Sequence, residues 1–501
     1  MKLITKKFFL SAVILSLLLT FTFCNSDNRL VDPSPADSTQ LTNITILYTN
    51  DEHGWMEPDN EYGGAAGMMG IWRDVEGYTE DGPFLIFSGG DMWTGPALST
   101  WFEGESMVEV MNAMGYNAAA IGNHEVDFGI DKLIQNSNDS SFPFLSANIV
   151  MTGTSNPPVW CQSYIIINVN NVSVGIIGLT TNQMPDMIFP EYREGLEFQS
   201  YDVALDRIVP QILNEGAELL IIISHMGMHE MRGLSDLAAQ YGIALMGGGN
   251  TDARMSEISN GVTLIAAGSK MKGYGKAEIL FNKETDQVIS IASGYYDNIG
   301  GTPDAAIENI VERWQNAAAE TLDEVIGYVN STINQSSPEM YNLITDSWLY
   351  AYPNADISIS NRGGVRQSIP EGEITFATIM GLLPFENNIV ELELTGIQLS
   401  DLFNTISGDF FVGGITTLGW TFQPSGLPIN DNETYKVLTT DYYYLNVSEM
   451  QLYDPDPYYS YVNWRQPLID YIKSLNTSVS NPLDNYLDSV ERQTPKLVFE
   501  Y

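Results

Sequence analysis

The chain has 501 residues, 44% of them hydrophobic and 17% charged, a composition that predicts two or three well-packed globular domains. Its 63 Asp and Glu residues outnumber 22 Lys and Arg residues, which gives a formal net charge of −41. Because binding to a phosphate backbone needs a basic face, we expect no DNA or RNA polymer as a partner. The only cysteines, Cys24 and Cys161, exclude a disulfide framework and a Cys-based zinc finger.

The first residues of the chain, 1–24, predict a signal peptide. Three lysines precede an apolar run, Phe8–Phe23, that is short for a membrane span. Cys24 lies where the run stops, which resembles a bacterial lipoprotein signal in which that Cys is lipidated. The alternative is ordinary cleavage of a signal peptide, because Phe23 stands at a position where a lipoprotein signal usually has a small residue. We therefore expect an exported protein of the periplasm or cell surface that meets the membrane only through a possible lipid anchor on Cys24.

A flexible tether, residues 25–42, is predicted next from its Asp, Ser, Asn and Pro content. From Ile44 onward, short apolar runs alternate with helical stretches, which predicts an α/β sheet with crossover helices over residues 43–302. The strand-like runs are apolar throughout, so we expect them to be buried on both faces. The expected strands are 44–49, 84–88, 118–122, 172–179, 219–224, 243–247, 263–267, 277–281 and 288–292, and the expected helices include Gly67–Glu76 and Ser106–Met114.

A long amphipathic stretch, Asp304–Val325, follows Pro303 and predicts a helix that links two domains, residues 303–325. The second domain is expected over residues 326–501. It should begin with a helix, Tyr341–Ala351, and continue with strands near 357–359, 389–394 and 435–439.

Polar residues follow several of the apolar runs, at the points where predicted strands end. Open α/β sheets place ligand sites at that edge. Asp51 and His53 are two residues apart, so in an extended segment both would project the same way, while Asp91 follows a glycine pair and could bridge two ions. Such a mixed oxygen and nitrogen set suits Mn, Zn, Fe or Co better than Ca. The segments are Thr49-Asn50-Asp51-Glu52-His53-Gly54, Ser88-Gly89-Gly90-Asp91, Gly122-Asn123-His124-Glu125 and Ser224-His225-Met226-Gly227.

Each of these patterns alone is also typical of a loop pair or a helix cap. Three of the four histidines, however, fall at predicted strand ends, which favours a common site. The fourth, His229, is expected to be an ordinary surface or interdomain residue.

The same residues resemble the calcineurin-like metallophosphatases, and specifically their 5′-nucleotidase branch. The resemblance runs from about Ile44 to the C-terminus. It implies an α/β fold: an N-terminal metallophosphatase β-sandwich flanked by helices in four layers (αββα), a helical linker and a smaller α/β C-terminal nucleotide-binding domain. The motifs are Asp51-x-His53, Gly90-Asp91, Gly122-Asn123-His124-Glu125-x-Asp127-Phe-Gly and Ser-His225-x-Gly, then Asn361-Arg-Gly-Gly-Val-Arg366 and Leu-Pro-Phe385-Glu-Asn.

The resemblance implies two divalent metal ions of the Zn, Mn, Co or Fe type. Asp51, His53 and Asp91 would hold the first ion. The second would be held by Asp91 together with Asn123 and His225.

It also implies a catalytic pair, in which His124 would stabilise the transferring phosphoryl group and Asp127 would orient it. In the second domain, Arg366 would contact substrate phosphate or nearby polar groups, and Phe385 would form one wall of a base-stacking clamp. Tyr442 is a candidate for the second wall. Asn361, Gly363 and Gly364 belong to the same substrate-binding motif as Arg366.

One metal segment of the family is missing. The family has a strand followed by Gly-His-x-His, or a variant with Gln in the final place, whereas this chain has Gly249 and Thr251 where those two ligands belong. Each ion would therefore lose one protein ligand, unless Asn250, Asp252 or water substitutes. The catalytic efficiency expected of the enzyme falls accordingly.

The sequence thus predicts an exported metallophosphatase that releases nucleoside and phosphate from nucleoside 5′-monophosphates or related small-molecule nucleotides. One alternative is a 2′,3′-cyclic-nucleotide phosphodiesterase with 3′-nucleotidase activity, which would use the same metal motifs. The other is a surface binding protein that keeps the fold but has lost catalysis.

Overall fold

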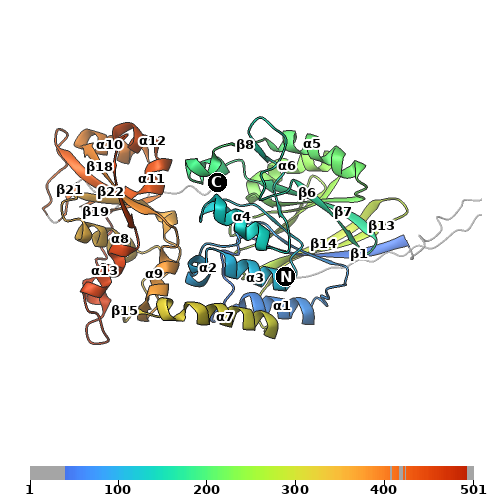
Figure 1. Cartoon of the computed structure of the whole chain (residues 1–501), viewed down its shortest axis with the longest axis horizontal. Helices are drawn as coiled ribbons and strands as arrows, with labels where there is room; N and C mark the ends of the chain where they lie inside the picture. Colours follow the sequence, from blue (N-terminus) through green and yellow to red (C-terminus); the bar gives the residue numbers. More distant parts are fainter. Residues whose placement is uncertain (1–39, 407–408, 417–420, 424, 493–501) are drawn as a thin grey trace, which may run out of the picture. The chain divides into compact units, whose positions relative to one another are not determined.

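The computed structural model describes residues 40–406, 409–416, 421–423 and 425–492 (Figure 1). The predicted signal peptide, with Cys24, and most of the predicted tether lie outside these residues. Over the part that is described, no helix combines the length and the apolar character needed to cross a bilayer.

Two six-stranded sheets form the first part of the fold, Leu41–Asp297, which we call the sandwich. The first sheet has the order β14-β13-β1-β2-β3-β4, in which β1 to β4 are parallel and β13 runs antiparallel to β1. Its strands are β1 (Leu41–Thr49), β2 (Phe84–Ser88), β3 (Ala118–Ala120), β4 (Phe144–Leu145), β13 (Gly273–Asn282) and β14 (Gln287–Asp297).

The second sheet has the order β11-β12-β10-β9-β7-β6. Its central strands β7, β9, β10 and β12 are parallel, and β9 is buried along its whole length, as its apolar sequence predicts. The strands are β6 (Tyr164–Val169), β7 (Val172–Thr180), β9 (Leu219–His225), β10 (Ile243–Gly247), β11 (Arg254–Ser259) and β12 (Val262–Ala267).

The sheets face each other across a core to which both contribute aliphatic side chains, among them Ile46 and Phe87 from the first sheet and Ile176 and Ile221 from the second. Helices cover both outer faces: α5 and α6 lie on the second sheet, and α1, α3 and α7 on the first (Figure 1). The predicted four-layer αββα arrangement is confirmed. These helices are α1 (Gly64–Asp74), α3 (Glu105–Met114), α5 (Tyr201–Asn214), α6 (Met228–Gln240) and α7 (Ala305–Leu322).

Helix α7 lies where the sequence predicts a linking helix. Asp304 starts it by accepting hydrogen bonds from the backbone N–H groups of Ala306 and Ile307. The helix ends at Leu322 and not at the predicted Val325, because β15 (Val325–Val329) begins there. Short elements complete the sandwich: α2 (Ala97–Trp101), α4 (Ile130–Asp139), β5 (Ile149–Met151) and β8 (Leu196–Phe198).

The C-terminal part, Val325–Arg492, is built on a five-stranded mixed sheet with the order β19-β16-β22-β18-β23. One face packs on α8 and α13, and the other on α10 and α11. This is the smaller α/β unit that the resemblance predicts. The elements are β16 (Ile357–Asn361), β17 (Gly372–Thr375), β18 (Asn388–Thr395), β19 (Phe410–Gly413), β20 (Ile415–Thr416), β21 (Thr421–Phe422), β22 (Thr434–Thr440) and β23 (Tyr458–Asn463), with α8 (Pro338–Ala351), α9 (Phe376–Leu382), α10 (Gly396–Thr405), α11 (Asp441–Asn446), α12 (Ser448–Tyr453) and α13 (Gln466–Ser474).

Candidate metal centre and substrate pocket

Four strand ends bring predicted metal ligands to one edge of the sandwich. Asp51 follows β1, Asp91 follows β2 and Asn123 follows β3, while His225 is the last residue of β9 in the facing sheet. Because β1, β2 and β3 are parallel neighbours, their carboxyl ends lie side by side. Nδ1 of His225 hydrogen-bonds the carbonyl of Gly89 at 2.8 Å, which ties the two sheets together at the site.

The candidate ligand atoms form two groups that share Asp91. Nε2 of His225 lies 3.1 Å from Oδ2 of Asp91, and Asp51 completes this group, whose ligand atoms all lie within 4.8 Å of one another. The second group joins Asp91 to His53 and His124, with Nε2 of His124 at 4.0 Å from Oδ2 of Asp91. Asp91 is thus placed where it can contact two ions. One group adds Asp51 and His225 to Asp91, and the other adds His53 and His124.

Two histidines present Nε2 to this cluster. Nδ1 of His225 contacts the carbonyl of Gly89, and Nδ1 of His53 contacts the carbonyl of Thr94 at 3.2 Å. Since a carbonyl oxygen only accepts, Nδ1 carries a proton in both histidines, so Nε2 is the nitrogen that is directed at the site and would bind a metal ion. Oδ1 of Asn123 is buried and has no hydrogen-bond partner among the described residues. Together with two carboxylates, these donors fit a divalent Mn, Zn, Fe or Co ion.

The ligand loops have strained backbone conformations. The φ angles of Asp51, His53 and Asp91 are 49°, 47° and 58°, in the left-handed region that non-glycine residues rarely adopt. The prediction that Asp51 and His53 project from an extended segment is therefore wrong, although Oδ1 of Asp51 and Nε2 of His53 are still 4.0 Å apart. A Cβ on Gly122 would lie 2.2 Å from Oδ1 of Asp91, so this close approach requires glycine.

Two buried glutamates hold these loops, and sequence reasoning missed them. Glu125 accepts hydrogen bonds from the backbone N–H groups of Asp91, at 2.9 Å, and Gly122, at 2.6 Å. Glu52 accepts one from the Ser88 hydroxyl at 2.9 Å, and burial raises its pKa to about 8. Glu52 directly follows Asp51, and Glu125 directly follows His124. This position next to a predicted site residue was the sequence signal that could have identified the two glutamates.

The missing segment borders the cluster. Gly249 follows β10 and is buried, and a Cβ on it would lie 3.2 Å from Oδ2 of Asp51 and 3.0 Å from Nδ1 of His225. Thr251, which stands at the second ligand position, is exposed. The glycine therefore supplies no side-chain ligand on the side where the family places its first histidine.

His124 is held by Asp127. Its Nδ1 donates to Oδ2 of Asp127 at 2.7 Å, which leaves Nε2 facing Asp91. Burial disfavours the charged imidazole, but the carboxylates of Asp127 and Asp91 outweigh burial and raise the pKa of His124. His229, by contrast, is exposed on α6 as expected of a surface residue.

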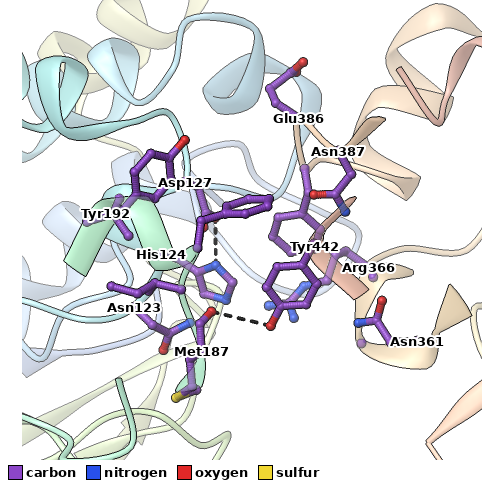
Figure 2. A pocket seen from close by; sticks show the side chains of 16 residues that line it. Asn123, His124, Asp127, Met187, Tyr192, Asn361, Arg366, Glu386, Asn387 and Tyr442 are labelled. Atoms are coloured by element: carbon purple, nitrogen blue, oxygen red, sulfur yellow. Dashed lines mark hydrogen bonds and ion pairs between the residues drawn. The ribbon is translucent and has the colours of Figure 1, made fainter. Parts of the chain in front are cut away.

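A pocket of about 180 Å³ beside His124 collects all the substrate-binding residues that were predicted in the second domain. Figure 2 shows Asn123 and His124 on one side of it and Asn361, Arg366 and Tyr442 on the other. The pocket is lined by Asn123, His124, Val126, Asp127, Met187, Ile188, Phe189, Tyr192, Asn361, Gly363, Gly364, Arg366, Phe385, Glu386, Asn387 and Tyr442.

Two residues of the C-terminal part contact histidines of the metal cluster directly. The ring of Phe385 stacks on the imidazole of His124, with centroids 5.5 Å apart and planes 19° apart. Nη2 of Arg366 lies 3.2 Å from Nε2 of His53, and its guanidinium carbon is 5.7 Å from the Phe385 ring centroid. Arg366 therefore contacts both a predicted metal ligand and a predicted wall of the base clamp.

The pocket has a further wall that no sequence motif marks. Met187, Ile188, Phe189 and Tyr192 belong to a loop of the sandwich between β7 and β8. Tyr442 packs edge-on against Phe189, with ring centroids 5.6 Å apart, and its hydroxyl donates to the carbonyl of Met187 at 3.4 Å. This aromatic loop was missed because its residues reach the site only through the tertiary fold.

Known proteins resemble the chain in sequence. Residues 318–453 match the family model of the 5′-nucleotidase C-terminal domain. Protein UshA of Salmonella pullorum is 27% identical over 87% of this chain and 90% of its own length, and a 5′-nucleotidase of Vibrio parahaemolyticus is 27% identical over 74% of this chain and 76% of its own. Endonuclease YhcR of Bacillus subtilis is 26% identical over 76% of this chain, but this chain spans only 34% of that longer protein.

The fold also has solved counterparts. The 5′-nucleotidase precursor of Thermus thermophilus superposes with a TM-score of 0.75 at 20% identity, over 90% of this chain and 99% of that one. The predicted resemblance is confirmed: the chain is similar in sequence and in fold to 5′-nucleotidases, and its residues 318–453 match the model of the C-terminal domain of that family.

Proposed function

We propose that the protein is a metal-dependent phosphohydrolase that releases nucleoside and phosphate from nucleoside 5′-monophosphates or related nucleotides. The observation that carries this proposal is the direct contact of Arg366 and Phe385 with His53 and His124. A nucleotide held by the C-terminal part would meet the metal ligands of the sandwich. The similarity to proteins named 5′-nucleotidase supports a hydrolase of the metallophosphatase type.

Asp51, His53, Asp91, Asn123 and His225 would hold two divalent ions, with Asp91 shared between them. Such ions, when bound, supply positive charge that offsets the phosphoryl charge and lowers the pKa of an attacking water. The chain's own contribution is the set of Nε2 lone pairs, carboxylates and the unpartnered amide oxygen described above.

His124 and Asp127 act on the phosphoryl group. Asp127 fixes the imidazole through Nδ1, so the other ring nitrogen is directed into the site, where a phosphoryl oxygen accumulates negative charge in the transition state. Arg366 supplies a second charged donor on the side of the C-terminal part. Both groups stabilise charge that grows during the reaction.

Phe385 and Tyr442 would hold the base. Aromatic faces stack on any nucleobase, so the pocket suits several nucleotides. The ring of Tyr442 is steadied by Phe189 and by its hydrogen bond to Met187.

A second function, nucleotide binding without catalysis, is favoured by one observation: Gly249 provides no ligand where it borders the cluster. Losing a group even outside the immediate metal shell commonly costs 10–100-fold in affinity or activity. A site with weak metal affinity would bind nucleotides without turning them over.

The experiment that separates these functions measures metal content and phosphate release from AMP with added Mn, Co or Zn, with 2′,3′-cyclic AMP as a parallel substrate. Absence of both a bound transition metal and phosphate release would exclude the enzyme. If AMP is hydrolysed, His124→Ala should lower kcat by roughly 100-fold or more. An unchanged kcat would refute the role of His124.

We also propose export of the chain, with the signal at residues 1–24 and Cys24 as a possible lipid attachment point. The support is the lysine-then-apolar sequence pattern alone. Mass spectrometry of the secreted or membrane-associated mature N-terminus distinguishes lipidation of Cys24 from ordinary cleavage. The boundaries 43–302, 303–325 and 326–501 are proposed for the two domains and their linker.

A further inference from the structure

The side of the pocket that belongs to the C-terminal part is built from two turns. The first, Asn361–Arg366, begins at the end of β16 and is called the arginine turn; the second, Phe385–Asn387, precedes β18 and is called the phenylalanine turn. Figure 2 shows Arg366, Glu386 and Asn387 on the same side of the pocket. Because one turn would contact the phosphate and the other the base, the spacing of the two turns has to match a nucleotide.

A single buried side chain, that of Trp464, contacts both turns. Trp464 directly follows β23, is 0% exposed, and packs in the core between the sheet and helices α8 and α13. The core also contains Trp348 of α8, whose ring centroid is 6.3 Å from that of Trp464 and whose Nε1 donates to the carbonyl of Trp464 at 3.1 Å. An indole that is enclosed in this way holds one position, so it can fix the position of its neighbours.

The indole of Trp464 packs directly against Gly364 of the arginine turn. A Cβ on Gly364 would lie 2.7 Å from Cη2 and 3.2 Å from Cζ3 of Trp464, closer than packed carbon atoms lie. The edge of the indole therefore limits how closely the arginine turn approaches the core. The end of this turn is anchored on α9, because the backbone N–H of Arg366 donates to the carbonyl of Leu382 at 2.8 Å.

The same residue holds both ends of the phenylalanine turn. Nε1 of Trp464 donates to the carbonyl of Phe385 at 2.8 Å, and the backbone N–H of Trp464 donates to the carbonyl of Asn387 at 3.0 Å. One indole thus binds the phenylalanine turn through its N–H and the arginine turn through its far edge. Loss of the indole N–H would leave the carbonyl of Phe385 without this partner.

The two neighbours of Trp464 hold the middle of the phenylalanine turn. Nδ2 of Asn463 donates to Oε2 of Glu386 at 2.9 Å, and Nη2 of Arg465 forms an ion pair with Oε1 of the same carboxylate. Oδ1 of Asn463 accepts a hydrogen bond from Nε of Arg465 at 3.0 Å, which joins these two contacts. Three consecutive residues that end at Arg465 therefore bind all three residues of the phenylalanine turn.

We propose that Trp464 is a positioning residue for nucleotide binding, which sets the spacing between Arg366 and Phe385. The inference rests on the proposed function, from which it takes the phosphate contact of Arg366 and the base wall of Phe385. Trp464 itself lies outside the set of described residues that line the pocket, so it acts through the two turns. A wall that is already held at the right distance loses less conformational entropy when a nucleotide binds, so the affinity for the base depends on Trp464.

The test measures binding by calorimetry with the Mn-loaded protein. The first probe is the phosphonate of AMP, in which a CH2 group replaces the ester oxygen so that it is not hydrolysed. The second is the same phosphonate of methyl riboside, in which a methyl group replaces the base. The ratio of the two affinities reports the base contact alone, whereas a general loss of folded protein lowers both affinities together.

The variant is Trp464→Phe, which keeps an apolar ring but removes the Nε1 donor and the edge that meets Gly364. The matched control is Trp348→Phe, which removes a buried indole donor from the same core. In the part of the chain that the structure describes, the hydrogen bonds and the ring contact of Trp348 involve no residue that lines the pocket. Both substitutions should lower the melting temperature, because each makes the core smaller.

We expect the wild type to bind the AMP phosphonate roughly tenfold or more tightly than the methyl riboside phosphonate, as one stacked base predicts. Trp464→Phe should reduce this ratio roughly threefold or more, and Trp348→Phe should leave it within about twofold. The proposal is overturned if the two variants change the ratio equally, if Trp464→Phe leaves it unchanged, or if the wild type does not prefer the AMP phosphonate.

Gly364→Ala tests the same contact without a change of Trp464. Its methyl group would overlap the edge of the indole, so the arginine turn has to shift and the affinity for both phosphonates should fall roughly fivefold or more. In a Trp464→Phe background the methyl group has room, so Gly364→Ala should lower the affinities less than about twofold there. Unchanged affinity in Gly364→Ala, or equal losses in the two backgrounds, would overturn the proposal. Phosphonate binding without hydrolysis of AMP would count against the proposed function alone.

Discussion

Nη2 of Arg366 donates a hydrogen bond to Nε2 of His53 over 3.2 Å, which joins the C-terminal part of the chain to a predicted metal ligand of the sandwich. The lone pair that accepts this hydrogen bond is the one that His53 would offer to a metal ion. Arginine and metal therefore compete for one nitrogen when no phosphate is present, and a bound phosphate would draw the guanidinium away.

Replacing Arg366 should consequently have two opposite effects. In Arg366→Ala, the dissociation constant of Mn measured without nucleotide should fall by about fivefold, because one hydrogen bond of about 1 kcal/mol no longer competes. The kcat/KM for AMP should fall roughly 10- to 100-fold, because a charged donor to the phosphate is lost. Metal titration and steady-state kinetics measure the two effects separately.

The matched control is Arg362→Ala. Arg362 flanks the same glycine pair, but its Nε donates to the carbonyl of Phe410 and its guanidinium lies over the ring of Tyr341. Neither the Mn affinity nor the kcat/KM should change by more than about twofold in this variant if the fold is retained. Equal effects of the two substitutions would contradict the assignment of Arg366.

Tyr442 should bind the base through its ring and not through its hydroxyl. The hydroxyl makes only a long 3.4 Å hydrogen bond to the carbonyl of Met187, whereas the ring faces the pocket beside Phe189. Tyr442→Ala should raise the KM for AMP roughly 5- to 100-fold, the usual effect of losing one stacking surface, with little change in kcat. Tyr442→Phe should keep the wild-type KM; a loss equal to that of the Ala variant would refute ring stacking.

Sequence reasoning located the ligand strands and the basic motif of the C-terminal part because the chemistry is confined to short segments. Asp91, Asn123 and His225 each stand at a predicted strand end, and parallel strands bring such ends together. A sequence motif, however, carries no information on backbone angles. The segment with Asp51 and His53 was expected to be extended, but both residues have left-handed conformations.

Residues that reach the site only through tertiary packing were not predictable in the same way. Phe189 and Tyr192 come from a loop with no motif and line the pocket only in the folded chain. The helical conformation of Tyr442 was also missed, since α11 begins at Asp441 after β22 and is capped by Thr440. Tertiary packing decides where Phe189 and Tyr192 lie, whereas the Thr440 cap is a local signal for the helix that begins at Asp441.

Gly249 offers a direct test of the missing ligand. Its Cβ would lie 2.9 Å from the carbonyl of Gly89, so any side chain must displace backbone, and Gly249→Ala should lower the melting temperature by a few degrees. Gly249→His adds the same strain together with an imidazole carried on a Cβ that would lie 3.2 Å from Oδ2 of Asp51.

The informative comparison is therefore between the His and Ala variants, which share the strain. Relative to Gly249→Ala, Gly249→His should bind Mn or Zn at least about tenfold more tightly, and saturating metal should restore part of its melting temperature. Metal affinities that are equal in the two variants would show that position 249 does not reach the ions.

Cys161 should be chemically silent in the folded protein. It is 7% exposed, and burial raises the pKa of its thiol well above the ordinary value. In a Cys24→Ser background, a thiol reagent such as DTNB at pH 8 should react with the native chain at least about 100-fold more slowly than with the urea-unfolded chain, because reaction requires opening of the fold. Rapid labelling of the native chain would contradict this burial.

The same thiol predicts how stability changes at alkaline pH. At pH values below the pKa of the unfolded thiol, about 8.5, the thiol is protonated in both the folded and the unfolded chain. The full contribution of the neutral buried thiol to the free energy of unfolding is then present. As the pH rises above that value, only the unfolded state ionises, so the free energy of unfolding should fall by up to about 1.4 kcal/mol per pH unit. Urea unfolding of the wild type and of Cys161→Ala between pH 8 and about pH 10 isolates this slope, because other titrating groups contribute equally to both. Parallel curves for the two proteins would show that Cys161 ionises as readily in the folded chain as in the unfolded one.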